Sequence, residues 1–320
     1  MVRYIVRRLL WAVVTLVIVS FVTFLIFYVL PPGDPAVLRA GHFPNPQQLV
    51  AIRHALGVDK PFWVQYWRYI SGIVLHFNLG YSYQYSQPVT AMIFDRLPAT
   101  ISLTVGAVVI WVSIGMTVGA ISAVRKRSVL DRLTMTGSLL AISAPTFWLG
   151  LMTLFLFSRD IGAVHIFDGA GTYVGLTANP GRWFGSLLLP WLVLAASLAA
   201  FYARLLRANL IETMSQDYIR TARAKGLTEP RVIWHHGVRA AITPVVTALG
   251  IDIGFLLGGA VVVESVFNVP GVGYLAYMGI RNADLPIIEG TVQFGAFFIV
   301  IANLIVDVAY AFLDPRVRYS

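Results

Sequence analysis

Cysteine is missing from this chain of 320 residues, and charged side chains are scarce. The absence of cysteine excludes disulfide bonds, thiolate metal sites and cysteine nucleophiles. Only 12% of the residues are Asp, Glu, Lys or Arg, whereas 58% are hydrophobic. In soluble domains about a quarter of the residues are charged. The composition therefore argues against a soluble globular protein and favours an integral membrane protein.

The sequence patterns that accompany nucleotide binding and catalysis are also missing. No G-x-x-x-x-G-K-[ST] loop is present to hold phosphates, and no H-E-x-x-H or intramembrane Ser-Lys pattern occurs. His235 and His236 are adjacent, so they would point to different faces of a helix and are poorly placed to share a metal ion. We therefore expect no catalytic site, no metal site and no cofactor bound by this chain.

Six apolar runs are long enough to cross a bilayer, which takes about 20 helical residues. They comprise residues 9–30, 99–124, 133–158, 183–203, 240–263 and 290–313. The first four contain no charged residue, the fifth contains Asp252 and the sixth contains Asp307. The first run precedes "PPGDPA" rather than a small-residue cleavage site, so we interpret it as a true span. The prediction is an all-α polytopic membrane protein with six transmembrane helices.

Basic residues are distributed unequally between the two sides that six spans define. Twice as many Lys and Arg residues lie in one set of segments as in the other, and the richer set comprises residues 1–8, 125–132, 204–239 and 314–320. Because basic residues collect in cytoplasmic loops, we expect both termini in the cytoplasm. The same rule explains the net charge of +9 better than nucleic-acid binding does. Residues 31–98 become a long external segment.

A charged stretch, "DYIRTARAKGL", interrupts the apolar chain on the expected cytoplasmic side. It consists of Asp217, Tyr218, Ile219, Arg220, Thr221, Ala222, Arg223, Ala224, Lys225, Gly226 and Leu227. Asp217 is a plausible N-cap, Gly226 can supply the left-handed residue that ends a helix, and Thr228 can cap a second helix. So short a helix is marginal in isolation, so we expect something to pack on its alanine-bearing face. It is either a solvated helix attracted to anionic lipid or a docking element for a partner protein.

Four further residues are candidates for functional or structural roles in the membrane. Asp252 lies at the middle of the fifth run, where a charge is costly, and serves either a water-filled path or the packing of a neighbouring helix. Asp307 is expected to be a structural partner near the cytoplasmic interface. Glu264 follows the fifth run as a helix-end carboxylate. Pro145 in the third run is either a gate hinge or a kink that neighbouring helices tolerate.

Several motifs together resemble one family, the transmembrane subunits of bacterial ABC importers, and specifically the first of the paired permeases for dipeptides and oligopeptides. The motifs are "LPPGDPA", "LGVDKPFWVQYWRYI", "DRLPATISL", "ISAPTFWLGL", "DYIRTARAKGL", "GGAVVVESVFNVPGVGYL" and "NLIVDVAYAFLDPRVRY". Each is weak by itself, but their order and spacing are specific and cover nearly the whole chain. One departure is that Val238-Arg239 stands where the general importer motif has Leu-Pro, and the first proline is Pro244.

The resemblance implies a type I ABC importer permease fold in the bacterial inner membrane. It implies that residues 217–227 are the coupling helix, which docks on an ATPase subunit. It places Glu264, Phe267 and Pro270 in a periplasmic gate region, and it adds Pro145 and Trp148 in the third span to the path or gate candidates. The expected division is residues 1–98, with the first helix and the external segment, and residues 99–320, a five-helix permease core.

The resemblance also implies partners and a substrate class. A second homologous permease would share the translocation path, two cytoplasmic ATPases would bind ATP and Mg, and an extracytoplasmic binding protein would deliver the substrate. That substrate is a di- or oligopeptide, or alternatively a nickel chelate, glutathione or another peptide-like solute. An alternative of a different class is a self-contained secondary transporter that uses Asp252 as its ion site. That class predicts inverted repeats, of which the sequence shows none.

Overall fold

The computed structural model describes residues 2–29, 45–56, 59–82 and 84–313. Helices predominate in this part of the chain, and its one sheet is a hairpin of β1 (Tyr81–Ser82) and β2 (Gln87–Pro88). The expected all-α class is confirmed. The "PPGDPA" motif at residues 31–36 and the segment 314–320 lie outside the described residues.

Within the described residues, four helices are long and apolar enough to cross a membrane singly. They are α1 (Val2–Phe24, continued by the π-helix η1, Leu25–Val29), α5 (Val89–Val124), α8 (Pro180–Thr213) and α15 (Leu285–Leu313). Two bent helix pairs add a span each if each pair is counted as one: α6 (Val129–Ser143) with α7 (Thr146–Phe157), and the segment Glu229–Ala241 with α12 (Thr243–Leu257). The fold therefore holds four to six spans, a range that includes the six expected.

The third expected span is not a straight helix. α6 and α7 meet at 99°, and the break falls at Ala144, which precedes Pro145. A residue before proline is disfavoured in the helical conformation, and Ala144 is accordingly extended, with φ −79° and ψ 124°. The interpretation of Pro145 as a mild, tolerated kink is therefore wrong, whereas its alternative role as a hinge stays a prediction. Residues 133–158 form two helices that can still count as one bent span. Pro145 instead caps a separate helix, on which Trp148 is half exposed.

α5, α8 and α15 are longer than the apolar runs that predicted them. At 1.5 Å per residue, the 36 residues of α5 extend over about 54 Å, whereas the hydrocarbon core is about 30 Å thick. α8 likewise continues to Thr213, beyond its expected end at residue 203. α15 begins at Leu285, so Glu289 lies inside the sixth span, which was expected to start at residue 290.

The central contact of the fold is between α5 and α8. Small residues let the two backbones approach closely, as is common between helices in membranes. A Cβ atom added at Gly119 would lie 2.6 Å from the carbonyl oxygen of Ala203, and one added at Gly106 would lie 2.0 Å from the ring of Trp191. The Trp191 indole donates a hydrogen bond to the carbonyl of Ser102 at 3.0 Å. The two helices therefore form the rigid centre of the molecule.

α12 and α15 form a second close pair. Gly250, Gly254 and Gly258 repeat every four residues along α12 and its C-cap, and they face α15. A Cβ atom added at Gly254 would lie 2.3 Å from that of Ala302. The glycine stripe therefore fixes which side of α12 faces α15.

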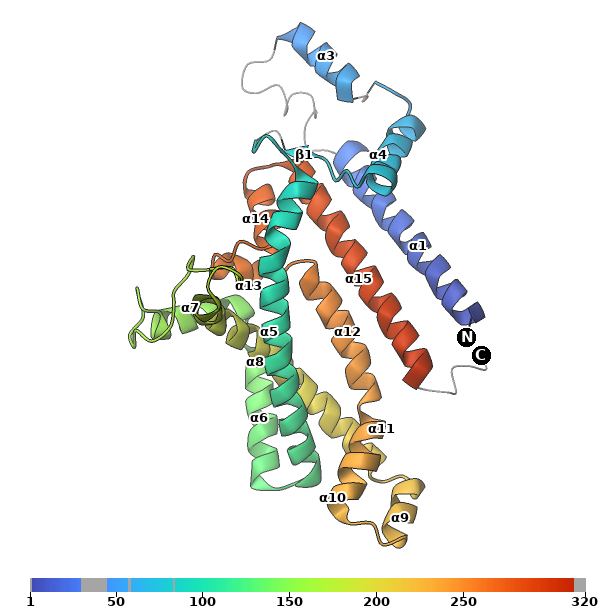
Figure 1. Cartoon of the computed structure of the whole chain (residues 1–320), viewed down its shortest axis with the longest axis vertical. Helices are drawn as coiled ribbons and strands as arrows, with labels where there is room; N and C mark the ends of the chain where they lie inside the picture. Colours follow the sequence, from blue (N-terminus) through green and yellow to red (C-terminus); the bar gives the residue numbers. More distant parts are fainter. Residues whose placement is uncertain (1, 30–44, 57–58, 83, 314–320) are drawn as a thin grey trace.

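α1 packs on the side of α15 away from α12 (Figure 1). Near the start of α1, Arg8 forms an ion pair with Asp307 at 2.8 Å. Asp307 therefore has the structural partner that was expected for it.

The remaining elements lie largely at two opposite ends of the molecule (Figure 1). One end holds the β-hairpin with α3 (Pro46–Leu56) and α4 (Phe62–His76). The other end holds α9 (Asp217–Ala224), α10 (Glu229–Arg231), the π-helix η2 (Val232–Val238) and α11 (Arg239–Ala241). α13 (Val261–Val266) and α14 (Val272–Arg281) connect α12 to α15. The segments expected outside and inside the cell are thus separated.

Two single glycine-to-alanine variants test the α5–α8 contact. Gly119→Ala places a Cβ atom against backbone and should destabilise the fold by about 1–3 kcal/mol, the usual cost of overpacking. Gly137→Ala in α6 is the matched control, because a Cβ atom there meets nothing within 4 Å. It should stabilise the helix by up to about 1 kcal/mol. Thermal unfolding of the protein in detergent should show midpoints that shift in opposite directions, and a shared direction would contradict the packing argument.

Candidate functional site

The charged stretch at 217–227 forms the short helix α9, which follows α8 at the end of the molecule opposite to the β-hairpin (Figure 1). Its N-cap is Gln216, so the expectation that Asp217 caps the helix is wrong, and Asp217 lies in the first turn. Gly226 has φ +77°, as expected for the residue that ends a helix. A Cβ atom at Gly226 would meet nothing within 4 Å, so the backbone conformation alone requires glycine there.

One face of α9 packs against its own chain. Ile219 is fully buried and Ala222 nearly so, and both pack with Val232 of η2, which is also buried. Met214 and Leu227 border this cluster. The element expected to cover the alanine-bearing face is therefore η2 of the same molecule. Ala222 points inward and is not available to a partner.

The rest of α9 is open to contact from outside the chain. Its exposed residues are Asp217, Tyr218, Arg220, Thr221, Arg223 and Ala224, followed by Lys225 and Gly226. Arg223 donates hydrogen bonds of 2.6 and 3.3 Å to Glu229, and this ion pair joins α9 to α10. Because both side chains are exposed, the pair contributes little stability. α9 is thus held mainly by its small apolar face, and its polar face is free.

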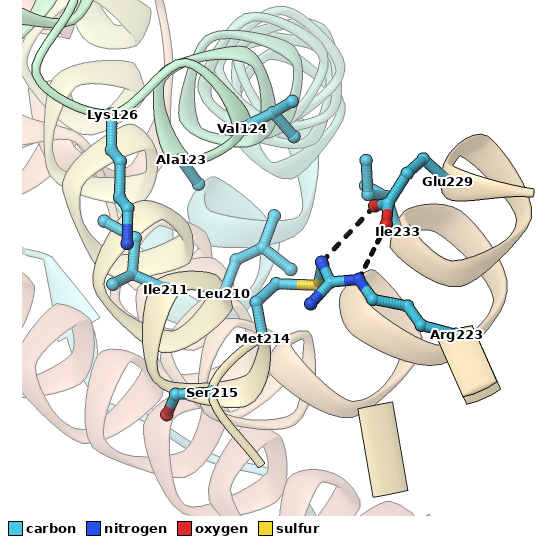
Figure 2. Close-up of a pocket in the computed structure, with 10 residues that line it drawn as sticks. All are labelled: Ala123, Val124, Lys126, Leu210, Ile211, Met214, Ser215, Arg223, Glu229 and Ile233. Carbon is cyan, nitrogen blue, oxygen red and sulfur yellow. Dashed lines mark hydrogen bonds and ion pairs between the residues drawn. The ribbon is translucent and has the colours of Figure 1, made fainter. Parts of the chain in front are cut away.

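A cavity of about 250 Å³ lies beside α9, between it and the ends of α5 and α8 (Figure 2). Its apolar lining residues are Ala123, Val124, Leu210, Ile211, Met214 and Ile233, and its polar ones are Lys126, Ser215, Arg223 and Glu229. The cavity leaves α9 without tight packing on this side.

The segment after α9 links it to the membrane core. The second helix expected from Thr228 is confirmed in position, but its middle, η2, is a π-helix. π-helices are rare, and they are frequently found at functional sites. The segment then bends by 49° into α12 between Ala241 and Thr243. α9 is therefore connected through η2 to α12, which with the segment Glu229–Ala241 forms a bent pair long enough to cross the membrane.

A buried ion pair connects three helices at the same end. Arg207 of α8 donates two hydrogen bonds to the carboxylate of Asp131 in α6, at 2.7 and 2.8 Å. Ser122 of α5 also bonds to Asp131. Sequence reasoning missed this site, although Ser128 and Asp131 form the S-x-x-D pattern of a capped helix start. The Asp131 amide indeed donates to the Ser128 hydroxyl at 3.1 Å.

Glu264 is the best-defined polar group toward the other end. It is fully buried, and its carboxylate accepts hydrogen bonds from the Thr100 hydroxyl at 2.9 Å and from the Tyr274 amide at 2.7 Å. Thr100 in turn accepts one from the Val272 amide at 2.8 Å. A Cβ atom at Gly271 would lie 2.4 Å from this carboxylate. Glu264 therefore ties α5, α13 and α14 together, and the interpretation as an ordinary helix-end carboxylate is wrong.

The other path and gate candidates fall into separate places. The loop between α13 and α14 lies beside the Glu264 carboxylate and contains Phe267, which is buried, and Pro270, which is exposed. α7, which carries Trp148, packs against α13, and a Cβ atom at Gly150 would lie 2.9 Å from Val266. The structure thus places α7 against α13 and the start of the loop between α13 and α14.

Asp252 belongs to a different neighbourhood. It lies on α12 and accepts a hydrogen bond of 2.6 Å from the Tyr202 hydroxyl of α8. This contact is the packing role that was one of its two expected roles. Its side chain also stays partly exposed, which the other expected role, in a path, requires.

Comparisons with known proteins agree with this architecture. Residues 115–319 match the family of binding-protein-dependent transport system inner membrane components, and residues 1–104 match the N-terminal region of such membrane components. The chain belongs to this family. It is a permease subunit of an ABC-type importer and a multi-pass inner membrane protein.

Two relatives match the permease over its whole length. A putative peptide transport system permease protein of Brucella abortus (strain 2308) is 40% identical over 320 residues, which is 100% of both chains. The glutathione transport system permease protein of Escherichia coli (strain K12) is also 40% identical over 100% of both chains.

Glu289 is a second acid that sequence reasoning missed in the permease. It is buried in α15 near Gln293, and each has one side-chain oxygen without a hydrogen-bond partner among the described residues. The sixth apolar run begins at residue 290, so the sequence alone places Glu289 in the external segment that precedes it. The helix start at Leu285 could have been found from the proline that follows it, since proline favours the first turn of a helix.

Substitutions of Glu264 test its hydrogen-bonding role. Burial raises the pKa of the Glu264 carboxyl above its ordinary value, so loss of its charge should be tolerated better than loss of its hydrogen bonds. Glu264→Gln keeps one acceptor oxygen and leaves only one of the two donors facing an amide NH2, so it should cost about 1–2 kcal/mol. Glu264→Ala leaves the buried Thr100 and Tyr274 donors unpaired and should cost more than about 2 kcal/mol. Thermal unfolding in detergent measures the difference, and equal losses for the two variants would show that the hydrogen bonds are unimportant.

Proposed function

We propose that the permease moves di- or oligopeptides into the cytoplasm as one half of a pair of permeases. The family membership supports the transport role, and the peptide permease of Brucella abortus supports the substrate class. The Escherichia coli glutathione permease is equally similar, so glutathione or another peptide-like solute is the alternative cargo. Two permease chains would enclose the translocation path between them.

The proposed energy source lies on partner proteins. Two cytoplasmic ATPases would bind ATP and Mg, and an external binding protein would deliver the substrate. The family description refers to binding-protein-dependent transport, which supports the latter partner. The proposed orientation places α9 and both termini in the cytoplasm. The distribution of basic residues supports this orientation, as does the position of α9 at the end opposite to the β-hairpin.

The exposed face of α9 is the proposed docking surface for an ATPase subunit. The observation that carries this assignment is that Ile219 and Ala222 are already covered by η2, while Arg220, Thr221 and Ala224 are exposed on the opposite face. Closure of the ATPases would push on this face and move η2. The 49° bend would then transmit the movement to α12.

A bulky residue on the exposed face tests the docking surface. Ala224→Trp should reduce co-purification of the ATPases with the permease at least tenfold, which corresponds to about 1.4 kcal/mol. The variant should otherwise fold normally, because residue 224 is exposed. Ala178→Trp is the matched control, since Ala178 is an exposed alanine in the 158–179 connection, on the expected external side.

The measurement is the ratio of ATPase to permease recovered through a tag on the permease. Full recovery of the ATPases with Ala224→Trp would show that this face of α9 is not the docking surface. Ala222→Trp is not informative for docking, because it would disrupt the contact with Val232.

A further inference from the structure

Besides exposed acids such as Asp95 of α5 and Glu212 of α8, and the buried Asp284 before α15, five acids lie in or next to the membrane-crossing helices, and they are not equivalent. Asp131 and Asp307 each form an ion pair with an arginine. Glu264 and Glu289 are buried inside the protein. Asp252 differs from all four, because it is partly exposed and, among the described residues, forms no ion pair.

The direction of Asp252 is set by the packing of α12. The glycine stripe Gly250, Gly254 and Gly258 faces α15, and a helix turns by 100° per residue, so Asp252 lies on the opposite side. Bulky substitution of the stripe is blocked, since a Cβ atom at Gly250 would lie 1.7 Å from Val306. Asp252 is therefore placed on the side of α12 that faces away from α15.

The Tyr202 hydroxyl holds one oxygen of the Asp252 carboxylate. Tyr202 is fully buried, its ring lies 6.2 Å from that of Trp111, and its hydroxyl donates to Oδ2 at 2.6 Å. Tyr202 is the one hydrogen-bond partner of the Asp252 side chain among the described residues. The carboxylate is thus held in one orientation, with its second oxygen available to a donor from outside the chain.

The exposed side of Asp252 must face a polar environment and not lipid. Its neighbours Ile251 and Phe255 on the same helix are 46% and 65% exposed. A carboxylate in contact with lipid at this depth is unfavourable by several kcal/mol, so acids within spans face protein or water. Inside the described chain only Tyr202 donates a hydrogen bond to it. The remaining side therefore faces a water-filled path or the second permease.

We propose that Asp252 lines the translocation path and pairs with the α-ammonium group of the passing substrate. This inference rests on the proposed function, because peptides and glutathione both carry that group. A carboxylate on the wall of a narrow path attracts a cation more strongly than it does in bulk water, because the surrounding protein and lipid have a low dielectric constant. The free oxygen of Asp252 supplies the acceptor for the ammonium, while Tyr202 keeps the carboxylate from turning away.

Two variants separate the charge of Asp252 from its hydrogen bond. Asp252→Asn retains the size and an acceptor for Tyr202 but removes the charge, whereas Tyr202→Phe removes the hydrogen bond but retains the charge. The assembled transporter in proteoliposomes is tested for ATP-dependent uptake of trialanine and of glutathione. Asp252→Asn should lower uptake at least tenfold, a factor that corresponds to about 1.4 kcal/mol, and Tyr202→Phe should lower it less.

Uptake by Asp252→Asn within about twofold of the wild type, which is below about 0.5 kcal/mol, would overturn the proposal. So would an equal loss in both variants, because a purely structural role of the hydrogen bond predicts that result. If the wild-type transporter takes up neither probe, the proposed substrate class fails instead. The two failures are therefore distinguishable.

The absence of cysteine allows a second, independent test of the path. Asp252→Cys introduces the only thiol of the chain, and a water-soluble methanethiosulfonate reagent should label it in the assembled transporter. Val13→Cys on the exposed surface of α1 is the control that faces lipid and should stay unlabelled. An unreactive thiol at position 252 would show that the residue does not face an aqueous path, whatever substrate the transporter carries.

Discussion

The close approach of α5 and α8 is the contact on which the rest of the permease depends. Glycine positions such as Gly106 and Gly119 leave no room for a side chain between the two helices, so their relative position is fixed by backbone geometry. Both helices extend beyond the bilayer, and they therefore carry fixed side chains at both ends of the molecule. Three acids are bound by residues of these two helices. Thr100 of α5 donates a hydrogen bond to Glu264, Arg207 of α8 pairs with Asp131, and Tyr202 of α8 donates a hydrogen bond to Asp252.

The low polarity of the membrane explains why these acids have such defined surroundings. A buried polar group without a partner is costly in hydrocarbon, so the helices that carry acids must be positioned relative to their donors. Asp131 thereby joins α5, α6 and α8 at the proposed cytoplasmic end, and Glu264 joins α5, α13 and α14 toward the other. The pairing that satisfies each acid also fixes the arrangement of helices around the central pair.

The segments that are proposed to move differ from this centre in their backbone structure. α6 and α7 meet at 99°, η2 is a π-helix, and a 49° bend precedes α12. α9 is held by a small cluster around Val232, beside a cavity of about 250 Å³. In the proposed mechanism, force from the ATPases enters at α9 and passes through these irregular segments to α12. The α5–α8 pair would provide the fixed frame against which they move.

The sequence by itself determined the membrane class, the all-α fold and the family, because long apolar runs and ordered motifs are local properties that need no knowledge of contacts. It also located α9 and its terminal Gly226, since helix caps depend on neighbouring residues. Only the tertiary structure decided which face of α9 is covered, because Val232 comes from another element. The pairing of Asp131 with Arg207 and the burial of Glu264 likewise depend on residues far apart in the chain. Packing between helices sets these features, and a hydropathy pattern does not show which residues of different helices contact each other.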